Sequence, residues 1–138
     1  MCGICGIINF DNKKINSNNL NKINLTQSHR GPDNNSLWIE KNIGLGHTRL
    51  SIIDLNVRSN QPMLNSSKRY VISFNGEIYN FLELKKRFNL FTKTNSDTEV
   101  ILKLFEKFGS KMVNMLEGMF SIIIYDQKKN VCYFFRDR

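Results

Sequence analysis

The strongest constraint on the fold is a long apolar, β-branched run near the end of the chain, Met119–Tyr125. Turn-forming residues follow over Asp126–Asn130, and a second apolar run occupies Val131–Phe135. Two such runs separated by a polar turn are typical of neighbouring antiparallel strands. The pattern therefore predicts a β-hairpin here, and with it a sheet that other strands must complete, because an isolated hairpin is only marginally stable.

Short apolar runs bounded by turn residues predict further strands over residues 4–10, 36–40, 43–50 and 70–74. Lys41-Asn42 is expected to join two of them in a hairpin, and Asn75-Gly76, the strongest short turn signal in the chain, is expected to end the last. Helical patterns cover residues 17–28, 81–88 and 111–116. Strands and helices mixed in this order favour an α+β fold.

One helix start is marked more clearly than the others. Ser96-Asp97-Thr98-Glu99 has the form of a capping box, with Ser96 as the N-cap and Glu99 three residues later. Apolar residues at helical spacing follow, and Gly109 suits the position just after the helix. Asp97 in the first turn would complement the helix dipole, a structural role that explains it without any function.

Composition limits the classes of protein to which the chain can belong. Its 138 residues predict one domain with room for a core. It contains no run of about 18 apolar residues and no signal-peptide pattern, so we expect a cytoplasmic protein that does not enter a membrane. Three cysteines, an odd number, argue against a disulfide framework. The net charge of +8 is scattered along the chain, which argues against nucleic-acid binding.

The first residues, Met1–Ile8, contain the most reactive candidate. Removal of Met1 would leave Cys2 with both a thiol and a free α-amine, which titrates near pH 7.7–8.0, roughly. Nucleophile and general base would then share one residue, as in N-terminal-nucleophile catalysis. Two alternatives remain on these residues alone: a chance cysteine at position 2, or a C-x-x-C pair formed with Cys5.

Three other segments carry candidate binding groups, each with a plainer alternative. Arg49 could offer its planar fork to a carboxylate, although it could equally be a surface residue. Asn75-Gly76 could supply an amide and a backbone N–H to an oxyanion hole, or could simply be a turn. Arg30-Gly31-Pro32-Asp33 is a rigid charged turn that could place side chains for binding or lie on the surface.

Taken together, these segments form an ordered set that is more specific than any one of them. The chain resembles the class II glutamine amidotransferase domain, specifically the glutaminase half of glutamine-hydrolysing asparagine synthetase, over essentially its whole length. The motifs that carry the resemblance are Cys2-Gly3-Ile4, Arg30-Gly31-Pro32-Asp33, Gly46-His47-Thr48-Arg49-Leu50-Ser51-Ile52-Ile53-Asp54-Leu55, Gln61-Pro62-Met63, Asn75-Gly76-Glu77-Ile78-Tyr79-Asn80, Ser96-Asp97-Thr98-Glu99, Gly118-Met119-Phe120 and Arg136-Asp137-Arg138.

The resemblance implies a role for each site residue. Cys2 would attack the side-chain amide of glutamine, and Asn75 and Gly76 would form the oxyanion hole. Arg49 would bind the α-carboxylate of glutamine. The remaining substrate contacts would come from Glu77 and Asp97 to the α-amino group and from the backbone of Ile52 and Ile53. No metal is expected, Cys5 and Cys132 are expected in the core, and His47 is expected to be structural.

The resemblance also implies an architecture and a larger context. The fold would be a four-layer αββα sandwich of two antiparallel sheets, of the N-terminal-nucleophile hydrolase type. Because residues 1–138 are fewer than the family's complete domain, we expect a partial glutaminase domain, an incomplete sandwich and an absent synthetase domain. No cofactor is expected in this chain, whereas ATP and Mg²⁺ would serve the synthetase domain. The expected partners are glutamine and that domain, with a homodimer as one assembly the family allows.

Alternatives to an asparagine synthetase remain open at this point. One is a close relative that amidates a sugar acid in surface polysaccharide synthesis. Another is a class II amidotransferase of the sugar-phosphate or phosphoribosyl type, which the motifs Arg30–Asp33 and Asn75–Asn80 disfavour. The third is a non-catalytic remnant that acts only as a folding or interaction module.

Overall fold

The computed structural model describes residues 2–138, which form two antiparallel sheets and their covering helices. In chain order the elements are β1 (Gly3–Ile8), α1 (Ser17–Leu25), β2 (Asn34–Glu40), β3 (Ile43–Arg49), the 3₁₀ turn η1 (Val57–Ser59), β4 (Met63–Leu64), β5 (Tyr70–Ile78), α2 (Phe81–Arg87), α3 (Asp97–Phe108), the 3₁₀ segment η2 (Gly109–Met115), β6 (Gly118–Asp126) and β7 (Val131–Arg136).

The first sheet has the strand order β1-β3-β2, with β3 in the centre. Gly3 of β1 pairs with Thr48 of β3, and Asn34 of β2 pairs with Arg49. The predicted hairpin at Lys41-Asn42 is confirmed, since β2 and β3 are joined there and Lys41 has a positive φ of 52°. This arrangement brings the start of β1 to the end of β3.

The second sheet has the order β4-β5-β6-β7, and it contains the hairpin that the C-terminal apolar runs predicted. β5 and β6 are long and pair from Tyr70↔Asp126 to Ile78↔Gly118. β4 is much shorter and pairs only with Val71 and Ile72 of β5. Most of one edge of β5 therefore has no neighbouring strand.

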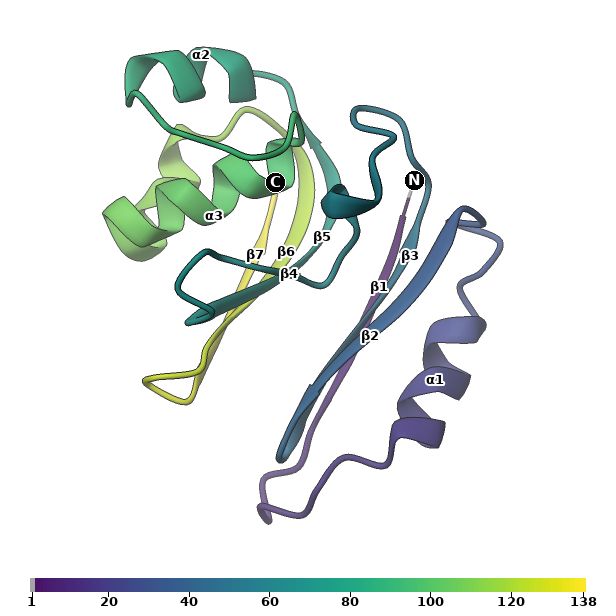
Figure 1. The fold of residues 1–138 in the computed structure, drawn as a ribbon. Helices are drawn as coiled ribbons and strands as arrows, with labels where there is room; N and C mark the ends of the chain where they lie inside the picture. Colours follow the sequence, from purple (N-terminus) through teal and green to yellow (C-terminus); the bar gives the residue numbers. More distant parts are fainter. Residues whose placement is uncertain (1) are drawn as a thin grey trace.

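The sheets stack face to face between two layers of helix, as Figure 1 shows. Helix α1 covers the outer face of the first sheet, and α2 and α3 cover the outer face of the second. This confirms the expected α+β sandwich of two antiparallel sheets. No helix within residues 2–138 is both long enough and apolar enough to cross a membrane.

The main hydrophobic core lies between the second sheet and α3. It is built from alternate residues of β5 and β6 and the buried face of α3, including Ile72, Ile122, Ile101, Leu104 and Phe105. Helix α1 packs closely on the first sheet, because Gly44 and Gly46 of β3 leave room for its side chains Leu20 and Asn24. A Cβ at Gly46 would crowd Asn24, so the glycines in this strand serve helix packing.

The expected turn at Asn75-Gly76 is wrong, because β5 continues through both residues to Ile78. Gly76 keeps its ladder register opposite Phe120, with a φ of 153° that side-chain-bearing residues rarely adopt. A Cβ at Gly76 would overlap the carbonyl oxygen of Met119 on β6. Glycine is therefore required by a close approach of two strands here, where the dipeptide pattern alone suggested a hairpin.

Helix α3 begins where the capping signal predicted, but only half of the capping box forms. Ser96 Oγ accepts a hydrogen bond from Glu99 N at 3.4 Å. The Glu99 carboxylate turns to the preceding loop, where it accepts from Lys93 N at 2.9 Å and from Thr94 N and Oγ1, both at 2.7 Å. The predicted helix at 111–116 is a 3₁₀ segment that begins at Gly109.

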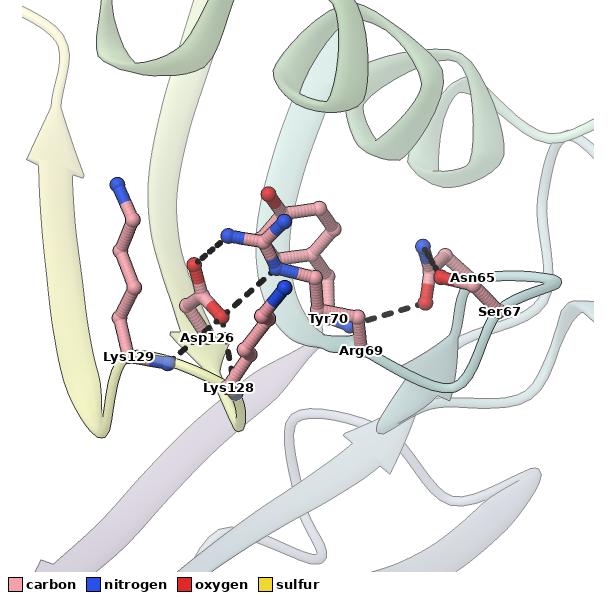
Figure 2. Close-up of polar contacts among 7 residues, drawn as sticks. All are labelled: Asn65, Ser67, Arg69, Tyr70, Asp126, Lys128 and Lys129. Atoms are coloured by element: carbon pink, nitrogen blue, oxygen red, sulfur yellow. Dashed lines mark hydrogen bonds and ion pairs between the residues drawn. The ribbon is translucent and has the colours of Figure 1, made fainter.

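One buried carboxylate closes one end of the second sheet (Figure 2). Asp126 accepts from Arg69 Nε at 3.0 Å and Nη2 at 2.7 Å, and from Lys128 N and Lys129 N. The hydrogen bond from Arg69 lowers the pKa of Asp126. Because these bonds join the start of β5 to the β6–β7 turn, they fix the register of three strands at this end.

Candidate functional site

A cavity of about 160 Å³ opens between the start of β1, the loop after β3, the open edge of β5 and the N-terminus of α3. It brings together seven of the eight site residues proposed from the sequence, from segments that are far apart in the chain. Those seven are Cys2, Arg49, Ile52, Ile53, Gly76, Glu77 and Asp97. Asn75 is the eighth, and it lies outside the lining.

Cys2 lies directly before β1, next to the end of β3, and both its side chain and its backbone are held by contacts. Its Sγ lies 3.4 Å from Leu50 N and 3.7 Å from Leu50 O, just beyond the end of β3. Its carbonyl accepts a hydrogen bond of 3.0 Å from Arg30 Nε. Cys2 is a free thiol and half-buried, so the sulfur is both positioned and accessible.

Arg30 belongs to the charged turn whose function the sequence left open. Gly31 allows that turn to lie against β3, because a Cβ there would overlap the backbone of Thr48. Asp33 N donates to Arg49 O at 2.9 Å, and Asp33 Oδ2 accepts from Ser51 N at 2.7 Å. The turn is therefore a support for Cys2 and for the loop after β3, a role that no pattern in the sequence indicated. The sequence showed only the rigid Gly-Pro between two charges.

Arg49 is almost fully buried at the end of β3 and faces the cavity. Its Nη1 donates to Asn60 Oδ1 at 2.6 Å and to Asn56 O at 3.1 Å, and its Nη2 donates to Asp54 O. These bonds wrap the loop 50–60 around the guanidinium. The group is thus a fixed cation at one end of the cavity, suited to a carboxylate.

Asp54 was not proposed for the site, yet it organises the cavity wall. Its carboxylate accepts from Asn56 N at 2.9 Å, Ser59 Oγ at 2.8 Å and Asn95 N at 2.9 Å. The backbone N–H of Asn56 is the largest cause of the lowered pKa of Asp54. These bonds tie the loop after β3 to the loop before α3. No pattern in the sequence indicated this contact.

Gly76 and Asn75 are adjacent on β5, but only Gly76 is among the residues that line the cavity. Gly76 lines the cavity at the open edge of the strand. The side chain of Asn75 is half-buried, and its Oδ1 is buried without a hydrogen-bond partner among residues 2–138. A half-turn of this amide would exchange its oxygen and its NH₂ group, two ends that the hydrogen-bond network normally assigns.

Asp97 and Glu77 supply negative charge at the end of the cavity formed by β5 and α3. Asp97 is buried, and it accepts from Ile78 N at 3.1 Å and from Thr98 N at 2.9 Å. Burial raises its pKa to about 6, opposed by those hydrogen bonds and assisted by the nearby charge of Glu77. Two carboxyl groups at this end of the cavity suit a cationic group of a ligand.

Ile52 and Ile53 lie in the loop after β3, exposed at the cavity rim. Their position leaves both backbone and apolar side chains at the opening. Within residues 2–138 no three His, Cys, Asp or Glu side chains gather as a metal site would require. The cavity thus offers a thiol, a fixed cation and two carboxyl groups, a set suited to a small amino acid with both termini free.

A comparison with protein families matches the glutamine amidotransferase domain over residues 1–138, the whole of this sequence. The chain belongs to the glutamine amidotransferase domain family. This agrees with the resemblance carried by the motifs, and it makes the chain a domain of the glutamine amidotransferase type.

Similar sequences are asparagine synthetases of the glutamine-hydrolysing kind. A candidate enzyme of this kind from Methanocaldococcus jannaschii is 44% identical and covers 100% of this chain. Asparagine synthetase 2 of Bacillus subtilis is 42% identical over 100% of the chain, and asparagine synthetase B of Escherichia coli is 37% identical over 99%. The chain spans only 30%, 19% and 25% of the lengths of these three relatives.

Solved structures confirm the fold class. The glutamine phosphoribosylpyrophosphate amidotransferase from B. subtilis, complexed with ADP and GMP, aligns with a TM-score of 0.54. The two sequences are 21% identical, and the alignment covers 64% of this chain and 22% of the amidotransferase chain. A structure of the allosteric regulatory enzyme of purine biosynthesis aligns with a TM-score of 0.56 at 23% identity, again over 64% of this chain and 22% of its own.

Proposed function

We propose that this domain hydrolyses glutamine to glutamate and ammonia, with Cys2 as an N-terminal nucleophile. The observation that carries the proposal is the meeting of Cys2, Arg49, Gly76 and Asp97 around one cavity. The cation of Arg49 would hold the α-carboxylate of glutamine, and Glu77 and Asp97 would hold its α-ammonium. The backbone of Ile52 and Ile53 would supply the remaining contacts to glutamine, and the side-chain amide of the substrate would then point at the thiol.

The chemistry needs Met1 to be removed, so that Cys2 carries a free α-amine. That amine accepts the thiol proton as sulfur bonds to the amide carbon, and the carbonyl oxygen becomes an oxyanion. Gly76 N–H and the Asn75 amide would stabilise this charge. The amine then returns the proton to the departing nitrogen, and ammonia leaves. Water attacks the thioester, which releases glutamate and restores the thiol.

Intact mass spectrometry with a glutamine-analogue diazo-ketone tests the nucleophile. We expect the purified chain to lack Met1 and to gain one adduct that peptide mapping assigns to Cys2. Cys2→Ala should abolish both the adduct and ammonia release, whereas Cys5→Ala should retain both, because Cys5 contacts Asn24 of α1. A folded protein that lacks Met1 yet takes no adduct on Cys2 would favour the alternative of a non-catalytic remnant.

We further propose that the ammonia serves an ATP- and Mg²⁺-dependent synthetase domain that makes asparagine from aspartate. The support is that the similar sequences are asparagine synthetases considerably longer than this chain. An amidotransferase for a sugar acid remains the second candidate. Adding the chain with glutamine to a synthetase partner, and comparing aspartate with a sugar acid as acceptor, distinguishes the two.

A further inference from the structure

The open edge of β5 presents a row of backbone groups to the cavity side. In this strand the odd-numbered residues bond to β6, as the flanking ladder bonds from Tyr79 N to Glu117 O and from Gln127 N to Arg69 O show. The N–H and C=O groups of even-numbered residues therefore point to the opposite edge. β4 covers that edge only as far as Ile72.

Beyond Ile72, side chains take the place of a neighbouring strand. Gln61 Oε1 accepts from Phe74 N at 2.7 Å, and His47 Nε2 lies 3.1 Å from Phe74 O. Further along the edge, Asp97 Oδ2 accepts from Ile78 N. Between these two positions lies Gly76, whose N–H is bonded by no side chain within residues 2–138 and whose residue lines the cavity.

The contact to His47 also defines which of its ring nitrogens carries a proton. A carbonyl oxygen can only accept, so His47 Nε2 must be the donor to Phe74 O. Burial lowers the pKa of His47 to about 4, and the charge of Arg49 acts in the same direction. The ring is therefore neutral at physiological pH, with Nδ1 unprotonated. Nδ1 is buried without a partner among the described residues.

We infer that His47 and Gln61 are positioning residues for the oxyanion hole, and we call the two together with Phe74 the Phe74 clamp. The clamp fixes both backbone groups of the residue two positions before Gly76. It links them to β3 through His47 and to the N-terminus of α3, because Gln61 Nε2 donates to Thr98 Oγ1 at 3.3 Å. Because Phe74 is fixed in this way, the N–H of Gly76 is held in a fixed position in the cavity relative to Cys2 and Asp97.

This inference rests on the proposed function, since it gives the clamp a catalytic consequence. A purely structural role predicts only a loss of stability. A positioning role predicts a loss of kcat with little change in KM, because an oxyanion forms only after the substrate is bound. The buried Ser73, whose Oγ donates to Gly46 O at 3.1 Å, provides a matched control. It joins the same two sheets from the same strand without touching the open edge.

The kinetic test compares His47→Leu, His47→Gln and Ser73→Ala in glutamine hydrolysis. His47→Leu should lower kcat about tenfold to a hundredfold while KM stays within about twofold, since small misplacements of catalytic groups have effects of this size. His47→Gln should recover most of kcat, because its amide can donate to Phe74 O. Ser73→Ala should lose stability but keep kcat. Gln61→Met removes the other half of the clamp with little change of shape. It should lower kcat as His47→Leu does, again with little change in KM.

Nuclear magnetic resonance provides a second readout that does not depend on turnover. Nitrogen-15 spectra should show His47 as the neutral tautomer protonated on Nε2. Amide exchange at Phe74 should be slow in the wild type and should accelerate at least about tenfold in Gln61→Met, while Val71, which pairs with Tyr125 in the β5–β6 ladder, stays protected. A proton on Nδ1, or unchanged exchange at Phe74 in the variant, would overturn the clamp.

The failures of the two proposals are distinguishable. An active wild type whose His47→Leu and Gln61→Met variants retain kcat would overturn the positioning role and leave glutamine hydrolysis intact. A wild type that lacks Met1, releases no ammonia and takes no adduct at Cys2 would overturn the proposed function and the catalytic role of the clamp with it.

Discussion

At the scale of residues, the cavity combines a buried carboxyl group, a nearly buried cation and a half-buried thiol. Asp97 has its pKa raised to about 6, while Arg49 is a nearly buried cation wrapped by the loop it orders. Among residues 2–138, the polar contacts of Cys2 Sγ are to the backbone of Leu50. The three groups suit three different parts of a glutamine molecule.

Replacing Asn75 with alanine should leave glutamine binding nearly unchanged and remove most turnover. One oxyanion-hole donor is typically worth about 2.7–4 kcal/mol in the transition state, or about a hundredfold to a thousandfold in kcat. Steady-state assay of ammonia release gives kcat and KM separately. Near-normal kcat in Asn75→Ala would exclude this residue from the oxyanion hole.

Replacing Asp97 with asparagine should raise KM for glutamine by about tenfold to a hundredfold, because a charged hydrogen bond to the α-ammonium is lost. In the wild type KM should also rise as the pH falls through about 6, where Asp97 becomes protonated. KM measured between pH 5 and 8 in both proteins checks this. Glu106→Gln on the same helix is the control for loss of charge, and its KM should follow the wild type.

The stability effect of Asp97 has the opposite sign to that of an ordinary paired carboxylate. Its pKa in the folded state lies above the value of 3.8 expected on unfolding, so the folded chain binds more protons between these values. Stability therefore falls as the pH rises from about 4 to 6, and it stays lower above that window. The group is kept ionised near neutral pH at a cost to folding, which is a common property of functional sites.

At the scale of elements, β5 connects the core to the site. Its residues Ile72, Phe74 and Ile78 pack against the α3 side, while Ser73 bonds across to β3. On the edge opposite β6, its far half has no neighbouring strand beyond β4, and side chains complete the hydrogen bonding there. The strand is therefore a rigid support whose open edge can offer a backbone N–H to a ligand.

Replacing Gly76 with alanine should destabilise the fold by about 3 kcal/mol, because the new methyl group would overlap the Met119 carbonyl at an unfavourable φ. Gly6→Ala is the matched control. Its Cβ would lie 3.0 Å from Gly44 O and needs only a small adjustment, so its cost should be about 1 kcal/mol or less. Urea unfolding of the three proteins measures the difference, and equal midpoints for both variants would contradict the close strand approach.

At the scale of the whole molecule, two sheets are joined through an interface that contains buried polar contacts. His47 and Ser73 bridge the sheets by hydrogen bonds, and Trp38 of β2 lies 5.8 Å from Tyr125 of β6, measured between ring centroids. Since this is the only tryptophan in the chain, its fluorescence reports directly on the contact between the sheets.

Acid should weaken the association of the sheets through His47. Its pKa is about 4 when folded and about 6.5 when unfolded, so the unfolded chain binds the extra proton between these values. The stabilisation is complete above pH 6.5 and is lost as the pH falls to about 4, a change of about 3 kcal/mol.

The measurement is urea unfolding followed by Trp38 fluorescence between pH 4 and 7. His47→Gln should lack this component of the pH dependence, and Ser73→Ala should retain it at a lower overall stability. Because Asp97 acts in the opposite direction over the same range, each variant is compared with the wild type at every pH. A His47→Gln profile parallel to the wild type would show that His47 does not titrate in this way.

The sequence by itself determined most of the strands and helices and the family. Alternating and β-branched apolar runs specified β2, β3, β6 and β7 because such patterns act locally, and Ser96 marked the start of α3 for the same reason. Seven of the eight residues that the motifs singled out line the cavity. Local patterns failed at Asn75-Gly76, where a turn-forming dipeptide lies inside a strand.

Only the tertiary structure decided why Gly76 must be glycine, since the constraint comes from Met119 on another strand. It likewise revealed the support of Cys2 by Arg30, the link from Asp54 to Asn95 and the clamp on Phe74, contacts between residues 13 to 41 positions apart. A side chain's partner across a fold leaves no periodic signal in the sequence. The chemical groups of the candidate site could therefore be predicted from the sequence, whereas their relative positions depend on how the two sheets pack.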